Sequence, residues 1–499
     1  MRPTGCVPGF AAAALALGLA GCALGPDYHP PAPPNVPLTA KPLPASTATA
    51  GGVAQRFDIG GRIAGDWWHL YRSPQLDALI DNALANNPSL KAAQATLRQA
   101  EENVRAADGA LLPTASAGAG IQRDKASTSG KAAFGGGDGG AVVPAYTLHS
   151  VSLTVSYSLD VFGGQRRQIE SIIAQADYQR WQLEAAYLTL TSNIVTAAVN
   201  EAALNAQISA TRALIADERQ LLGILQQQVQ LGGAAQTQLL QQQSQLAQQE
   251  ATLPPLQAQL ARAQNQLAAY AGQFPGAFQL RAFTLDDLTL PATIPVSLPS
   301  SLVAQRPDIQ AAAAQLHEAT ANVGVADANM LPQITLSANI GHEALAASSL
   351  FTPQSLLWSL VASATQPLFE GGALIAQRKA AVYGMRAAAE QYQSTVISAF
   401  QNVADALSAL QYDADALAAA DAAAAAAQQS LAMTQAQYKL GGEPFASVLT
   451  AEITYQNALM GKIKAKAARL SDMAALYQSL GGGWWHRQDV AGQCCGVIP

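Results

Sequence analysis

The sequence carries little charge. Charged residues make up 12% of the 499 positions, about half the share usual in globular proteins, and the net charge is −6. A chain with this balance has no basic footprint for nucleic acid. Beyond the amino terminus it also lacks any run of 18 apolar residues, so hydropathy predicts no transmembrane helix.

The chain also lacks the spacing patterns of common active sites. No Gly-x-Ser-x-Gly turn, phosphate-binding loop or His-x-x-x-His pair is present. The six histidines lie far apart: His29, His69, His149, His317, His342 and His486. Asp66 precedes His69 by three positions, which we interpret as packing and not as catalysis. The sequence therefore predicts no enzyme, no metal site and no cofactor.

Cysteine is scarce, with four residues in the chain. Cys494 and Cys495 are adjacent in the carboxy-terminal tail, where neighbouring thiols cannot cross-link a fold and no second pair with metal-ligand spacing is near. We interpret this tail as dispensable. Cys6 falls inside the amino-terminal signal described next, which leaves Cys22 as the cysteine with a predicted role.

The amino terminus predicts a secretory signal. Arg2 supplies the positive charge, an apolar run follows, and the segment ends Leu19-Ala20-Gly21-Cys22. That ending resembles a bacterial lipobox, in which the cysteine is acylated with lipid chains such as palmitate and becomes the first residue after cleavage. The alternative is an ordinary secretory signal with an incidental cysteine. We predict lipidation of Cys22, and the following Ala23 is compatible with sorting to the outer membrane.

One stretch predicts a membrane strand. From Ser150 to Leu159, apolar residues alternate with serine and threonine without an error. An apolar face opposite a face of small hydroxyls suits a transmembrane β-barrel, which needs about 9–11 residues per crossing. A strand of a soluble β-sandwich has the same pattern, so this stretch alone fits either a membrane strand or a sandwich strand. The segment that follows distinguishes the two.

That following segment predicts a very long helix. After Gly164 no proline occurs until Pro254, and Gly223 is the one glycine before Gly232. A helix over 164–231 would be about 100 Å long at about 1.5 Å per residue, which is typical of a coiled coil or helical barrel. Its apolar residues recur at spacings of three and four, but Glu201, Thr211 and Glu218 interrupt the heptads and exclude a simple two-stranded zipper.

The second half of the chain repeats the first. Asn87-Pro88 aligns with Arg306-Pro307, and Leu112-Pro113 with Leu331-Pro332, both at an offset of 219. At an offset of 209, Gly232-Gly233 aligns with Gly441-Gly442, and each pair follows a long helix as a predicted tip turn. One structural unit is therefore used twice.

These segments predict a signal peptide over 1–21, an extended lipid-anchored arm over 22–65, repeat 1 over 66–285, repeat 2 over 286–483 and a tail over 484–499. Repeat 1 has strands at about 114–122 and 148–160, a long helix at about 164–231 and a returning helix at about 234–272. Repeat 2 has the same elements at about 333–341, 356–369, 373–440 and 444–480. Trp358, in the fourth strand, fits an interfacial anchor or a core position.

Four strands per chain cannot close a barrel. An open sheet edge in lipid leaves backbone amides and carbonyls without partners, and known membrane barrels begin at about eight strands. The protein should therefore close its barrel by oligomerisation. Strand counting alone permits either two or three copies.

The duplicated plan resembles the TolC-like outer-membrane efflux factors, in particular the NodT/OprM-like lipoprotein branch. The residues that carry the resemblance span the mature chain: Cys22, Gly25-Pro26-Asp27-Tyr28, Asp66-Trp67-Trp68, Asn87-Pro88, Leu112-Pro113, Asp160-Val161-Phe162-Gly163, Arg306-Pro307-Asp308, Leu331-Pro332 and Leu440-Gly441-Gly442. The implied fold is mixed and mainly α, with four membrane strands and long periplasmic helices per chain.

The resemblance implies a homotrimer with a β-barrel in the outer membrane standing on an α-helical barrel in the periplasm. A mixed collar would surround the helices, formed by residues 66–85, 273–300 and the last thirty. The implied partners are a periplasmic adaptor (membrane fusion) protein and an inner-membrane pump of the RND type. The implied function is the exit duct of a tripartite efflux system.

The sequence departs from the family at the helical tips. Family members commonly carry aspartates just after the glycine turn, where a trimer forms acidic rings. Here those positions hold Ser447 and Thr450 in one repeat and Gln238 and Gln241 in the other. A gate would then rest on hydrogen bonds among these residues and Tyr438, or on Glu443. Each of them singly fits equally well as a residue that solvates a helix end.

The sequence is also compatible with two other functions. The same fold serves type I protein secretion, and the sequence does not separate that from efflux of drugs, metals or fatty acids. A structural or adaptor lipoprotein of helical hairpins is the alternative of a different class. It would have one hairpin and flanking β domains, without strands of membrane length.

Overall fold

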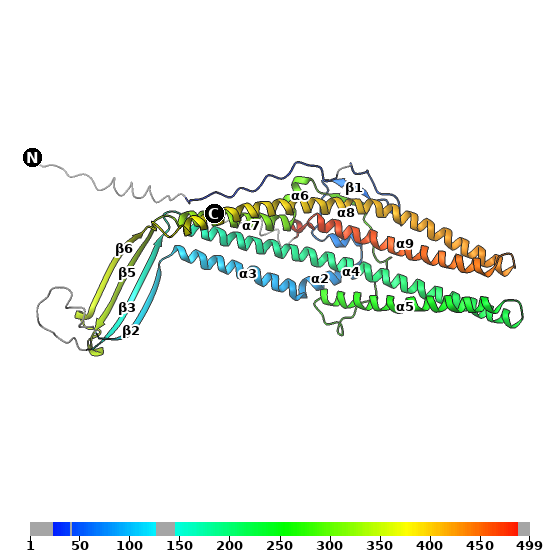
Figure 1. The fold of residues 1–499 in the computed structure, drawn as a ribbon, viewed down its shortest axis with the longest axis horizontal. Helices are drawn as coiled ribbons and strands as arrows, with labels where there is room; N and C mark the ends of the chain where they lie inside the picture. The colour runs from blue at the N-terminus through cyan, green and yellow to red at the C-terminus, as the bar shows by residue number, and fades with distance from the viewer. Residues whose placement is uncertain (1–22, 40–41, 126–144, 488–499) are drawn as a thin grey trace, which may run out of the picture. The chain divides into compact units, whose positions relative to one another are not determined.

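The computed structural model describes residues 23–39, 42–125 and 145–487 (Figure 1). Cys22, Cys494 and Cys495 lie outside these ranges, so the predicted lipidation site is not among the described residues. The chain divides into two compact units. Unit 1 comprises Met1–Pro30, Arg98–Asp177 and Ala314–Glu390, and unit 2 comprises Pro31–Leu97, Tyr178–Ala313 and Gln391–Pro499. Each unit takes segments from both halves of the sequence, so the units do not coincide with the two repeats.

Unit 1 contains an antiparallel sheet of four strands in the order β2-β3-β5-β6 (Figure 1). The strands are β2 (Thr114–Asp124), β3 (Tyr146–Leu159), β5 (Gln333–Ala344) and β6 (Leu356–Thr365). The fourth strand is shorter than the expected 356–369, because Pro367 has no amide hydrogen to donate and a turn over 370–372 follows. Among the described strands of this sheet, β2 and β6 each have a neighbour on one side only.

The strand register gives the sheet two different faces. Leu153 lies opposite Ala117 and Ile340, and Ile340 lies opposite Trp358, so one row across four strands is apolar. The adjacent row is polar and holds Ser116, Thr154, Asn339 and Ser359. Asn339 Nδ2 donates a hydrogen bond of 2.8 Å to Thr154 Oγ1 in that row. Trp358 is 74% exposed, so the interpretation of it as a core residue within one chain is wrong.

The helices follow the duplicated pattern. The long helices expected over 164–231 and 373–440 are α4 (Gly164–Gln230) and α8 (Ala373–Lys439), each of 67 residues. The returning helices expected over 234–272 and 444–480 are α5 (Gln236–Tyr270) and α9 (Phe445–Ser479). The remaining helices and 3-10 turns are η1 (Trp67–Tyr71), α2 (Pro74–Asn86), α3 (Pro88–Asp108), η2 (Gly109–Leu111), α6 (Pro299–Gln305), α7 (Pro307–Ala328), η4 (Ala347–Ser349), η5 (Pro353–Ser355) and η6 (Trp484–His486).

The second half of the predicted arm is more structured than an extended chain. Within it, β1 (Arg56–Ile59) pairs in parallel with β4 (Thr293–Val296), a strand that the sequence did not predict. Phe57 and Ile63 enter the main hydrophobic core of unit 2 beside Trp67. The buried guanidinium of Arg469 donates hydrogen bonds to the carbonyls of Ala50 and Val53. Burial of apolar side chains and these bonds fold residues 42–65 onto the helices.

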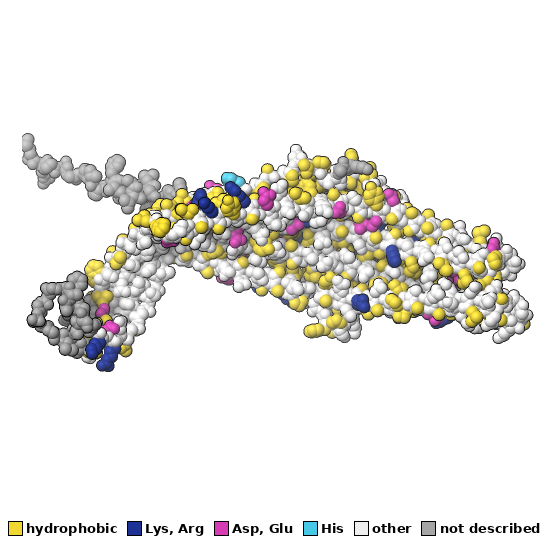
Figure 2. Space-filling model, in the orientation of Figure 1, with side chains coloured by type: hydrophobic (Ala, Val, Ile, Leu, Met, Phe, Trp, Pro, Cys, Tyr) yellow, Lys and Arg dark blue, Asp and Glu magenta, His cyan; other side chains and the backbone are white. Residues whose placement is uncertain are grey.

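No helix in the described part of the chain is both long enough and apolar enough to cross a membrane. On the face drawn in Figure 2, dark blue and magenta side chains are sparse, in line with the 12% of charged residues.

Candidate functional site

Both helical hairpins of unit 2 turn through the same backbone motif (Figure 1). After α4, Gly232 has a φ of 74° and the Gly233 amide donates to the Gln228 carbonyl over 2.7 Å. After α8, Gly441 has a φ of 77° and the Gly442 amide donates to the Gln437 carbonyl over 2.9 Å. This is the Schellman ending of a helix, in which a residue of left-handed conformation favours glycine. The predicted tip turns thus have a physical requirement for Gly232 and Gly441.

A small apolar cluster joins the two hairpins next to these turns. Leu225 of α4, Leu239 of α5 and Phe445 of α9 are buried in it, and Tyr438 of α8 packs against them. The Tyr438 ring lies 5.7 Å from that of Phe445, and its hydroxyl donates to Gln228 Oε1 over 3.1 Å. Burial raises the pKa of Tyr438, so the hydroxyl keeps its proton. Of the predicted gate residues, Tyr438 is the one that bonds across the two hairpins in the described contacts.

The other predicted gate residues are local in this chain. Gln238 Oε1 accepts the Ala235 amide at the start of α5, and the Thr450 hydroxyl donates to the Ala446 carbonyl within α9. Gln241 and Thr450 are exposed. Glu443 and Ser447 are half-buried. These side chains solvate or cap helix ends in a single chain, so a role in a gate would require other copies of the chain.

The same hairpins contain buried carboxyls that the sequence analysis did not assign to a site. Glu218 of α4 is 4% exposed and Glu452 of α9 is 6% exposed. Two glutamines of α5, Gln242 and Gln249, are buried beside them at 0% and 2%. The signal for Glu218 was present in the sequence, since it interrupts an apolar heptad pattern. Nothing in the sequence placed Glu452 near it.

In unit 1, the start of the amino-terminal arm is held by hydrogen bonds. The Leu24 amide donates to the Phe162 carbonyl, and Arg167 Nε donates to the Leu24 carbonyl over 3.0 Å. Arg167 also forms an ion pair of 2.6 Å with Asp27, which lowers the pKa of that carboxyl. The first described residues of the arm are therefore fixed at the end of β3 and the beginning of α4.

Two glycines make room for this arm. A Cβ on Gly163 would lie 2.6 Å from the Ala23 Cα, and a Cβ on Gly324 would lie 2.6 Å from the Leu24 carbonyl oxygen. Both distances are below normal contact, so larger residues would displace the arm. Tyr28 then stacks on His317 with ring centroids 4.4 Å apart. Arg167, Gly163 and Gly324 therefore form a binding site for the arm, which we call the dock. At this point the arm is not an unattached linker.

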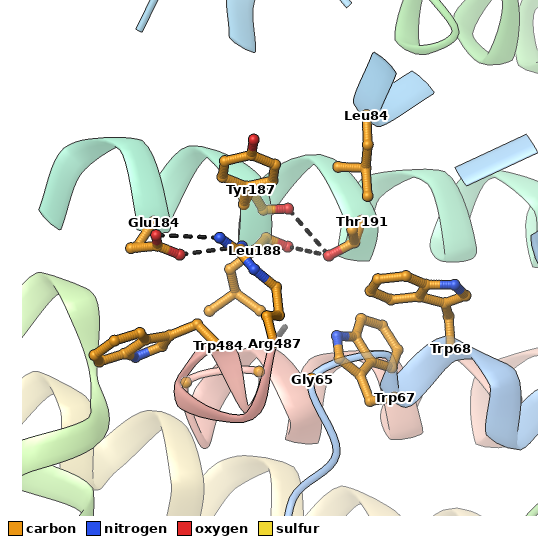
Figure 3. A pocket seen from close by; sticks show the side chains of 12 residues that line it. Gly65, Trp67, Trp68, Leu84, Glu184, Tyr187, Leu188, Thr191, Trp484 and Arg487 are labelled. Carbon is orange, nitrogen blue, oxygen red and sulfur yellow. Dashed lines mark hydrogen bonds and ion pairs between the residues drawn. The ribbon is translucent and has the colours of Figure 1, made fainter. Parts of the chain in front are cut away.

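A third feature is an aromatic cavity in unit 2, with a volume of 240 Å³ (Figure 3). Trp67 and Trp68 form one wall, and Trp484 with the Glu184–Arg487 ion pair forms another. The Arg487 guanidinium lies 4.3 Å from the centre of the Tyr187 ring, where a cation is attracted by the aromatic face. These contacts hold the residues around 481–487 against α4, which gives the cavity a packing role.

The Asp66–His69 pair does form, with His69 Nδ1 3.0 Å from Asp66 Oδ2. Asp77 lies 3.7 Å from the other ring nitrogen. The His69 and Asp66 side chains are 49% and 60% exposed, so the pair lies at the surface of unit 2.

The four-stranded sheet and the two long helical hairpins together fit one class of protein, a channel of the outer membrane. Residues 79–273 and 298–482 match the family model described as outer membrane efflux protein. The chain belongs to this family, and it is an outer-membrane efflux channel. Because the family is one of channels, the interpretation as an adaptor lipoprotein is wrong.

Similar proteins extend over nearly the whole chain. The chain is 30% identical over 447 residues to the pyoverdine export outer membrane protein OpmQ of Pseudomonas aeruginosa, covering 89% of this chain and 93% of that protein. It is 27% identical over 476 residues to the cation efflux system protein CusC of Escherichia coli O6:H1, covering 94% and 97%. Among solved structures it is similar to the outer-membrane channel OprN, with a TM-score of 0.83, 25% identity and coverage of 93% and 100%.

Proposed function

We propose that three copies of this chain form one continuous exit duct across the outer membrane. The observation that carries this is the four-stranded sheet, in which β2 and β6 each pair on one side only among the described strands. Open edges are costly in lipid because backbone groups there have no water to bond. Antiparallel pairing of β6 with β2 of the next copy would close a barrel of twelve strands.

The two faces of the sheet support the same arrangement. The apolar row through Leu153, Ile340 and Trp358 suits contact with lipid, and the row of Ser116, Thr154 and Asn339 suits a water-filled lumen. Trp358 then fits the aromatic belt at a membrane interface. We prefer three copies to two because the chain resembles the TolC-like class, and that resemblance implies a homotrimer.

The proposed partners are a periplasmic adaptor and an inner-membrane pump of the RND type, which would supply both substrate and energy. This chain would act as a conduit without catalysis or cofactor. Its relatives are named for export of pyoverdine and for efflux of cations, so small exported molecules or ions are the proposed cargo class. Type I protein secretion is the second candidate, since it uses the same fold.

We further propose that Cys22 carries the lipid anchor. The residue that follows it, Ala23, lies next to Gly163, and the Leu24 amide bonds to the Phe162 carbonyl, just after the end of β3. If β3 crosses the membrane, its periplasmic end is where acyl chains on Cys22 can enter the inner leaflet. The dock formed by Arg167, Gly163 and Gly324 would keep the anchor at that depth.

The experiment is native mass spectrometry of the purified protein in mild detergent, together with conductance recording in planar bilayers. A trimer that conducts supports the duct. A stable monomer whose strands form a closed barrel contradicts the trimer. Chemical cross-linking in cells then separates the partners: capture of an RND pump supports efflux, and capture of an ATP-driven secretion transporter supports protein secretion.

A further inference from the structure

A polar seam lies between the two helical hairpins of unit 2, inside an otherwise apolar contact. Its members are Glu218 on α4, Gln242 and Gln249 on α5, and Glu452 on α9, each at least nine-tenths buried. The Gln456 amide of α9 donates to Gln249 Oε1 across the two hairpins, and the Gln242 amide donates to the Glu218 carbonyl over 3.4 Å within the α4–α5 hairpin. The seam therefore ties one hairpin to the other, some turns away from the Tyr438–Gln228 bond.

Several polar atoms of the seam lack a hydrogen-bond partner among the described residues. Glu218 Oε2, Glu452 Oε2, Gln242 Oε1 and Gln249 Nε2 are buried and have no hydrogen-bond partner among the described residues. Buried polar atoms are normally bonded, because leaving one unpaired costs about 1–3 kcal/mol. Two buried carboxyl groups that lack a cation partner are easiest to bury when they are protonated.

The charges around the pair are acidic. For Glu218, burial is the main cause that raises the pKa to about 7, and Glu452 and Glu250 raise it further, while Gln245 acts in the opposite direction. For Glu452, burial likewise raises the pKa to about 7, with Asp217 of α4 adding to it and Gln435 of α8 opposing it. The basic residue next to Glu218, Arg219, is bonded at the surface to Glu250. The groups of the four helices that act on Glu218 and Glu452 are therefore carboxylates and amides.

We propose that Glu218 and Glu452 form a proton-operated latch between the two hairpins, which pack together when the pair is protonated and part when both carboxylates are ionised. The consequence for a channel mouth rests on the proposed function, but the latch itself is a property of one chain. Because the pKa of each carboxyl is raised in the packed state, protons stabilise packing. That stabilisation is complete below the ordinary value of 4.5 and is lost as the pH rises through about 7.

The latch is tested first by the distance between the hairpins. Spin labels at Ala247 of α5 and Gln437 of α8, in a chain with Cys494→Ser and Cys495→Ser and diluted into unlabelled copies, report that distance by pulsed electron resonance at pH 5, 7 and 8.5. We expect the packed-to-parted ratio to fall by about three to four orders of magnitude between pH 5 and 8.5, with the fall ending as the pH passes about 7, because each of the two carboxyls contributes about 75-fold. The double variant Glu218→Gln, Glu452→Gln should stay packed at every pH.

The matched control is Asp405→Asn, which removes an exposed acid of α8. It should keep the wild-type transition unchanged. An identical pH response in wild type and the double Gln variant would overturn the latch, as would a wild type without any response. If Mg²⁺ at pH 8.5 restores packing in wild type but not in the variant, the seam binds a cation and the proton latch is wrong. Conductance of the same proteins reports separately on the duct.

Discussion

The bond between Tyr438 and Gln228 gives a test of whether contacts between the two hairpins hold the tip of the channel closed. Tyr438→Phe removes only the hydroxyl that donates to Gln228 Oε1 over 3.1 Å. A hydrogen bond of this kind contributes about 0.5–1.5 kcal/mol, so the open fraction should rise by about two- to tenfold. Tyr438→Ala also removes the ring that packs on Phe445 in the cluster next to the turns. Because the ring is half-buried, we expect the loss of ring and hydroxyl together to destabilise the closed state by about 1.5–3 kcal/mol. The open fraction should then increase by about 10- to 100-fold.

The assay is resting conductance of single channels in planar bilayers, with Tyr412→Phe as control because Tyr412 of α8 is 63% exposed. A double-mutant cycle with Gln228→Leu isolates the bond. Gln228→Leu and Tyr438→Phe should each raise conductance, and the double variant should add little to either. Additive effects would show that the two side chains act separately. Conductance unchanged in both Tyr438 variants would refute the idea that this contact keeps the hairpins together.

Three further predictions concern the anchor and the tips. Cys22→Ala should leave an uncleaved or unanchored precursor, and mass spectrometry of the amino-terminal peptide would contradict lipidation if it found unmodified Cys22 in the mature protein. Thr450→Asp should increase cation selectivity and sensitivity to divalent block, because carboxylates ringed at a pore attract cations; reversal-potential recordings that show no change would point to Glu443 as the acid in use. Gly441→Ala should destabilise the turn after α8 by about 1–2 kcal/mol, because φ is 77° at this position. The control Gly384→Ala lies within α8, where a Cβ would meet open space, and it should stabilise the chain by about 0.5–1 kcal/mol. Thermal unfolding measures both changes.

The sequence by itself determined the elements that depend on local pattern. The period of two over Ser150 to Leu159 predicted β3, and the absence of proline after Gly164 predicted α4, because both signals act between residues close in the chain. The Gly-Gly pairs predicted the two tip turns, since a left-handed helix ending favours glycine. The repeat then carried these predictions to the second half.

Only the tertiary structure decided the contacts between distant segments. β1 and β4 are short and pair across more than two hundred residues, so no local period marked them. Glu218 interrupted a heptad, yet the sequence could not show that Glu452 lies on the neighbouring hairpin or that both are buried. The dock for Ala23 and Leu24 likewise depends on the space left by Gly163 and Gly324. In each case the deciding quantity is burial against a partner far away in the chain, which the local pattern of residues does not contain.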